Sequence, residues 1–96
     1  MPKTFYINKE KPMRHLLTTG RVYILRQRKI DEGIAQLKSK LPQYKNINKK
    51  IQVKFVEELW SPAELLTYVN QSGYHSIHQW IREEGTKRYL YKVTII

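Results

Sequence analysis

The spacing of apolar residues divides the chain into short strands and short helices. Residues 4–7 and 22–25 are continuous β-prone runs, and the second suits a strand buried on both faces. Residues 51–55 and 89–95 alternate between apolar and polar side chains. That period of two predicts strands with one face in contact with water.

Other segments follow a helical or an irregular pattern. Apolar residues recur at helical spacing between positions 30 and 41, which predicts a helix capped by Asp31 and ended by Pro42. One or two helical turns are predicted over residues 13–18. Residues 43–50 are polar, basic and without periodicity, so we expect a loop there.

Two further helices have the clearest boundary signals in the chain. The first begins with Ser-Pro-Ala-Glu at residues 61–64, which supplies an N-cap serine, a first-turn proline and a capping-box glutamate, and it ends before Gly73. The second repeats the capping-box spacing with Ser76 and Gln79, and Gly85 closes it.

This order of elements predicts the fold class. Strands and short helices fill all 96 residues without a long linker, so residues 1–96 should form a single domain. A mixed sheet of this size can bury enough apolar surface only if it curls. We therefore predict an α+β fold, a small and partly closed β-barrel with short flanking helices.

The charge of the chain is strongly one-sided. Residues 1–56 hold fourteen basic and three acidic residues, a net charge of +11, whereas residues 57–96 carry −1. Such clustering costs self-repulsion and suggests a polyanionic partner, with nucleic acid as the first candidate. An idle basic surface and a module that binds an acidic protein are the alternatives.

Composition narrows the remaining function classes. The chain has no cysteine, which excludes disulfides, thiolate metal sites and a cysteine nucleophile. No apolar run approaches the roughly 20 residues of a membrane span, so we expect a soluble cytoplasmic protein without a membrane partner. Glycine-rich phosphate loops, serine elbows and zinc signatures are absent from the sequence, and no cofactor is predicted.

Three stretches resemble one known family. Residues 17–26, Leu-Thr-Thr-Gly-Arg-Val-Tyr-Ile-Leu-Arg, resemble the opening signature of ASCH domains, a branch of the PUA-like superfamily. Residues 68–76, followed by Trp80 and Ile81, are similar to a second stretch of that group. Residues 89–93 look like its final barrel strand. The resemblance implies a PUA-like barrel with a cleft, associated with RNA or modified nucleosides.

The resemblance also bears on catalysis. Some ASCH members are amidohydrolases of acylated cytidines, others are linked to nucleic-acid cleavage, and their signature contains lysine, threonine and arginine. If Arg26 matches that arginine, Arg21 replaces the lysine and Ile24 the threonine. Isoleucine offers no nucleophile and arginine no base. Binding is thus favoured, and no catalytic residue is assigned. The alternative is a small hydrolase, an amidohydrolase or nuclease, acting on modified nucleosides or RNA.

The basic residues supply the first part of a candidate RNA site. Arg26 and Arg28 are expected to lie on one strand face, where both guanidinium groups can meet one phosphate backbone. For any single arginine, a structural ion pair is the alternative role. Lysines in the predicted central loop are expected to contribute positive electrostatic potential rather than specific contacts. The basic candidates are Arg21, Arg26, Arg28, Lys29, Lys49 and Lys50.

Aromatic residues supply the second part, because single-stranded RNA is held by stacking as well as by charge. Tyr23 and Tyr74 are the aromatic site candidates, and Tyr74, after Gly73, is expected to be the most accessible. Trp80 is expected in the core. His75 and His78 are too few for a metal site, so none is predicted. RNA is expected to be preferred to DNA.

Overall fold

The chain forms one five-stranded mixed sheet accompanied by helices. The computed structural model describes residues 3–85 and 88–96. Its elements in chain order are β1 (Lys3–Tyr6), α1 (Glu10–Thr19), β2 (Arg21–Arg26), β3 (Gly33–Lys38), η1 (Pro42–Tyr44), β4 (Lys49–Glu58), η2 (Pro62–Thr67), η3 (Val69–Gln71), α2 (Ile77–Glu84) and β5 (Tyr89–Ile95), where η denotes a 3₁₀ helix. The α+β class is confirmed.

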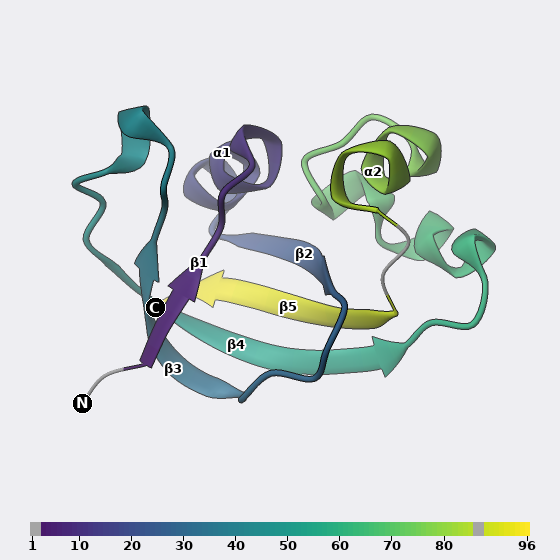
Figure 1. Ribbon diagram of the computed structural model, residues 1–96, viewed down its shortest axis with the longest axis horizontal. Coiled ribbons are helices and arrows are strands. Elements are labelled where there is room, and N and C mark those ends of the chain that lie inside the picture. Colours follow the sequence, from purple (N-terminus) through teal and green to yellow (C-terminus); the bar gives the residue numbers. More distant parts are fainter. Residues whose placement is uncertain (1–2, 86–87) are drawn as a thin grey trace.

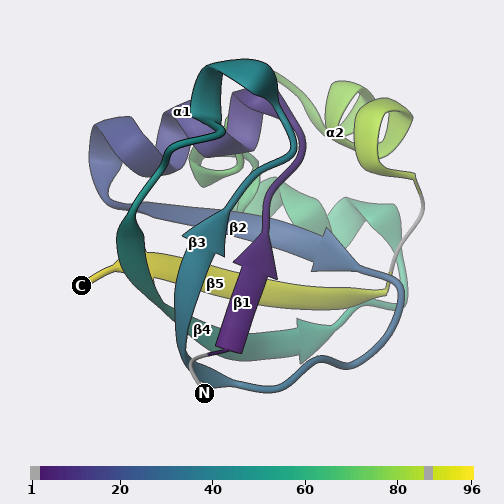
Figure 2. The ribbon, with the colours of Figure 1, turned by 60° about the vertical axis from the view of Figure 1, so that its left-hand side comes forward.

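The sheet is open and curled. Its strand order is β1-β3-β4-β5-β2, so β1 and β2 are the edge strands. The β1–β3 pair is parallel and the other three pairs are antiparallel. Figure 1 shows both α1 and α2 on the β2 side of the sheet. In Figure 2, β1 and β3 run steeply across β2 and β5, as expected of a strongly curled sheet.

The inner face of the sheet forms the main core with α1. Alternation along each strand turns every second side chain to this face. Met13 and Leu16 of α1 pack against it, because they lie one helical turn apart on the same side of the helix. The buried inner-face residues are Phe5, Val22, Ile24, Ala35, Leu37, Ile51, Val53, Tyr91 and Val93.

A second cluster lies at one end of the opposite face. Leu25 of β2 and Leu90 of β5 point there and are covered by residues of η2 and α2, including Leu65 and Trp80. Trp80 has no exposed surface, so its predicted core position is confirmed. These helical elements therefore cover only one end of that face.

The predicted helix over residues 30–41 is wrong. Residues Gly33–Lys38 form β3, which pairs with β1 on one side and β4 on the other. Gly33 has φ of +119°, which an α-helix does not allow. Ile34, which contributed to the helical spacing, is 61% exposed. Pairing on both sides therefore outweighs the local periodicity.

Two other boundaries differ from the prediction. Lys49 and Lys50 lie in β4 rather than in a loop, because this strand extends to pair with Leu37 and Gln36 of β3. The segment after Ser61 forms two short 3₁₀ helices rather than one α-helix.

Both predicted N-caps are confirmed. The Glu64 carboxylate accepts a 2.9 Å bond from the Ser61 backbone N–H, and the Ser61 side chain accepts one from Ala63. The Ser76 hydroxyl accepts a 3.1 Å bond from the Gln79 backbone N–H at the start of α2. The sequence signals thus located both helix starts.

Candidate nucleic-acid interface

Twelve side chains form the part of the sheet that the helices leave uncovered, here called the outer face. They occupy the strand positions opposite in direction to the buried inner-face residues, and none of the twelve is buried. The outer face consists of Thr4, Tyr6, Arg21, Tyr23, Ile34, Gln36, Lys38, Lys50, Gln52, Lys54, Lys92 and Thr94.

The outer face is basic and contains no acidic residue. Its five cations come from four different strands: Arg21, Lys38, Lys50, Lys54 and Lys92. Lys54 of β4 lies directly opposite Lys92 of β5 in the antiparallel register. Like charges in directly opposed positions destabilise a sheet. The ion pairs found among residues 3–85 and 88–96 involve none of these five cations.

A tyrosine pair borders the outer face on the β2 side. Tyr23 lies opposite Lys92, and its ring contacts that of Tyr68 with the centroids 4.8 Å apart. The Tyr68 hydroxyl donates a 3.1 Å hydrogen bond to the Glu57 carboxylate. Burial and this bond raise the pKa of Tyr68. The bond also restrains the Tyr68 ring, which contacts Tyr23 in a tilted arrangement.

A second tyrosine lies at the other edge. Tyr6 of β1 is 47% exposed and pairs in register with Lys38. The ammonium group of Lys40 lies 5.8 Å from the centre of the Tyr6 ring. An exposed aromatic ring with two cations beside it therefore occupies this edge.

The structure brings three of the predicted site residues together. Arg21, Tyr23 and Lys50 all belong to the outer face. Lys49 is exposed, but it follows the inner-face alternation with Ile51 and projects away from Lys50. Lys49 is thus separated from the outer face.

The predicted pairing of Arg26 with Arg28 on one strand face is wrong. β2 ends at Arg26, and Arg28 lies in a bend beyond it, exposed. Lys29, also beyond the strand, places its ammonium group 5.9 Å from the centre of the Tyr89 ring. The predicted geometry required β2 to continue by two residues.

The prediction that Tyr74 is accessible is also wrong. Tyr74 is only 5% exposed, and its ring stacks on Trp80 with the centroids 6.4 Å apart. Burial, followed by the charges of Glu84 and Glu83, raises the pKa of Tyr74 well above its usual value. Tyr74 therefore belongs to the second buried cluster, with Leu65 and Leu90.

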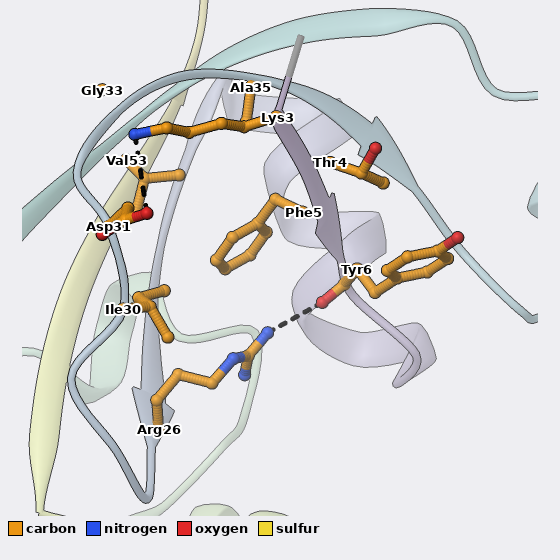
Figure 3. A pocket seen from close by; sticks show the side chains of 10 residues that line it. All are labelled: Lys3, Thr4, Phe5, Tyr6, Arg26, Ile30, Asp31, Gly33, Ala35 and Val53. Atoms are coloured by element: carbon orange, nitrogen blue, oxygen red, sulfur yellow. Dashed lines mark hydrogen bonds and ion pairs between the residues drawn. The ribbon is translucent and has the colours of Figure 1, made fainter. Parts of the chain in front are cut away.

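Arg26 lines a pocket beside β1, together with inner-face residues such as Phe5. Tyr6 also lines the pocket, and Figure 3 shows Phe5 and Arg26 facing it while the Tyr6 ring points away from Phe5. The pocket has a volume of about 470 Å³, and its walls include Ile30, Ala35 and Val53. An ion pair of 3.8 Å between Lys3 and Asp31 lies at its rim. Burial lowers the pKa of Arg26, and the negative charge of Glu84 opposes that shift.

Three cations of the outer face escaped the sequence prediction: Lys38, Lys54 and Lys92. Lys54 and Lys92 occupy the polar positions of two correctly predicted alternating strands, so the signal was present. What sequence alone lacked was the register that places these two lysines opposite each other. Lys38 was hidden by the wrong helix prediction.

The two positions that matter for the hydrolase alternative point in opposite directions. Arg21 belongs to the outer face, whereas Ile24 is 1% exposed and lies in the main core. Thr19, a hydroxyl-bearing residue next to β2, is engaged with the backbone, because its hydroxyl lies 2.8 Å from the carbonyl oxygens of His15 and Arg21. These described residues do not converge on a catalytic site.

Within the described ranges, no three His, Asp or Glu side chains are placed to hold a metal ion. None of the described helices has the length and apolar character needed to cross a membrane.

No protein-family model, curated protein or solved structure matches this chain.

Proposed function

We propose that this protein binds nucleic acid through the outer face, with RNA preferred to DNA. The observation that carries the proposal is the opposition of Lys54 and Lys92 on a surface with five cations and no acid. A phosphate backbone relieves this repulsion, and the release of its condensed counterions drives binding.

Polar groups between the cations support the preference for RNA. Gln52 and Thr94 lie opposite each other in the middle of the outer face, and Arg21 is the next residue in the same row. Amide and hydroxyl groups can donate to and accept from a ribose 2′-hydroxyl, which DNA lacks. The interface thus combines backbone attraction with a means of distinguishing the two sugars.

We also propose that the fold is a variant of the PUA-like barrel and that the chain is related to ASCH domains. The curl of the sheet supports this, as does the hydrogen bond from Arg26 on one edge strand to Tyr6 on the other. The sequence stretches described above are the other support. A cytoplasmic location would agree with RNA as the partner.

The proposal is tested by fluorescence anisotropy with a labelled single strand of about twelve nucleotides, as RNA and as DNA. We expect RNA to bind more tightly than DNA. A plot of the logarithm of the binding constant against the logarithm of the salt concentration should have a slope of roughly −0.7 for each neutralised phosphate. In the double variant K54Q/K92Q the slope should be shallower by about 1.4, because two phosphate contacts are lost.

The matched control is K11Q/R82Q, which removes the same charge from exposed positions on α1 and α2. It should retain the wild-type slope. The proposal is wrong if wild type binds no nucleic acid at low salt, or if both double variants weaken binding equally. Displacement of RNA by polyglutamate at equal charge concentration would instead favour an acidic protein partner.

A further inference from the structure

We infer that the outer face takes an unpaired single strand, which crosses the sheet from Tyr6 to Tyr23 and stacks a base at each end. This inference rests on the proposed nucleic-acid binding and adds the form of the ligand. The two tyrosines lie on the same face but on opposite edge strands, β1 and β2.

Tyr6 is suited to stack on a base. Tyr6 is 47% exposed although it belongs to a strand, and Figure 3 shows its ring directed away from Phe5. Lys38 is its partner in register, and the ammonium group of Lys40 lies over one face of the ring, which leaves the other face for a base. A base on the ring would thus have cations within reach of its adjoining phosphates.

Tyr23 provides the corresponding position at the other edge. Tyr68 contacts its ring and is itself held by Glu57, so Tyr23 is supported rather than free to turn. Lys92 is its partner in register, and Lys54 follows in the same row. Both ends of the face therefore combine one tyrosine with two lysines.

The positions between the two tyrosines suit a polar chain. Adjacent strands lie about 4.8 Å apart, so the four intervals from β1 to β2 span about 19 Å across the strands, and the path from Tyr6 to Tyr23 is longer because it also runs along them. Lys50, Gln52 and Thr94 lie along this diagonal. A strand of several nucleotides fits such a path, within the range of about 4–16 nucleotides known for small single-strand-binding domains.

A duplex could not use the tyrosines. Paired bases stack on one another and hide the ring faces that Tyr6 and Tyr23 would contact. The deep and narrow major groove of double-stranded RNA also excludes a sheet surface. A duplex would therefore contact the lysines alone and bind more weakly at moderate salt.

The test compares an RNA single strand of about twelve nucleotides with its own duplex, using wild type, Tyr6→Ala and Trp60→Ala. We expect the single strand to bind more tightly to wild type. Tyr6→Ala should weaken single-strand binding by roughly 5- to 150-fold, as expected for one lost stacked base, and leave duplex binding unchanged. Trp60 is 74% exposed and lies outside the outer face, so Trp60→Ala is the control for losing an exposed aromatic ring.

The outcomes separate this inference from the proposed function. If duplex binds as tightly as single strand, or Tyr6→Ala behaves like Trp60→Ala, while K54Q/K92Q still weakens binding, only the single-strand inference fails. If wild type binds neither form at low salt, the proposed function fails as well. Circular dichroism of Tyr6→Ala should match wild type, so lost binding reports the ring rather than unfolding.

Discussion

The guanidinium group of Arg26 donates a 2.8 Å hydrogen bond to the backbone carbonyl oxygen of Tyr6. Arg26 ends one edge strand and Tyr6 ends the other, so this side chain joins the two edges that the backbone leaves unpaired. The same group bonds the Leu25 carbonyl oxygen at 3.1 Å and lies 4.9 Å from the centre of the Phe5 ring. Arg26 is thus held in place by the fold, which explains why it is separated from the outer face.

Replacing Arg26 should therefore weaken the fold. Arg26→Met keeps most of the apolar stem but removes the donors, so we expect a loss of about 1.5–3 kcal/mol in the free energy of unfolding, typical of hydrogen bonds from a charged group. Urea unfolding followed by tryptophan fluorescence measures this. Arg28→Met is the matched control and should stay within about 0.5 kcal/mol of wild type, because Arg28 is exposed beyond β2. Equal stability of the two variants would show that the bond to Tyr6 contributes little.

Sequence predicts the elements with strong local signals and fails where pairing decides. The strands around Val53 and Val93 were predicted because strict alternation has no helical interpretation. β3 was missed because its exposed Ile34 completes a helical spacing that only its two neighbouring strands exclude. Local propensity carries no information about such partners.

The candidate site shows the same division. Arg21, Tyr23 and Lys50 are candidates from the sequence that the structure places on one face of the sheet, with Tyr23 half-buried. Whether Arg28 shares a strand face with Arg26 depended on where β2 ends, and the burial of Tyr74 depended on packing against Trp80 and the second cluster. Both features depend on contacts between residues far apart in the sequence.

Gly73 should be intolerant of any side chain. It has φ of +89°, and a Cβ atom there would lie 2.4 Å from the backbone oxygen of Lys11 at the start of α1. Gly20 has a similar φ of +86° but no atom within 4 Å of its Cβ position. We expect Gly20→Ala to cost about 1–2 kcal/mol from the left-handed backbone alone. Gly73→Ala should cost clearly more, because backbone atoms must also move apart.

Thermal unfolding of the two alanine variants measures this difference. Near-ultraviolet circular dichroism should also change in Gly73→Ala, since Tyr74 and Trp80 stack directly after this turn. If the two variants have the same Tm, the close approach to Lys11 is not a feature of the folded protein in solution.

His15 should make the stability of the protein depend on pH. Burial of the ring, and then the positive charge of Arg21, lower the pKa of His15 below its ordinary value of 6.5. The unfolded chain therefore binds this proton first as the pH falls. The contribution of His15 to stability is complete above 6.5 and is lost as the pH falls through the lower pKa of the folded state.

This dependence can be measured as the change in Tm between about pH 7.5 and about pH 5.5, where histidine is the main titrating side chain. His15→Gln should show a smaller decrease in Tm than wild type. His78→Gln removes one exposed histidine from α2 and should retain the wild-type decrease. A decrease that is equal in all three proteins would contradict the assignment to His15.

The opposition of Lys54 and Lys92 predicts a conflict between stability and binding. Lys54→Thr removes the repulsion and places a β-branched residue in a strand, so the free energy of unfolding should rise by about 0.2–1 kcal/mol. Gln52→Thr, two residues away on the same face, is the control for β-propensity without a charge change. The extra gain of Lys54→Thr over Gln52→Thr should shrink as salt rises, because salt screens exposed charges. Over the same salt range, Lys54→Thr should bind single-stranded RNA more weakly than wild type does. A gain that is independent of salt would mean that repulsion between the two lysines is not its source.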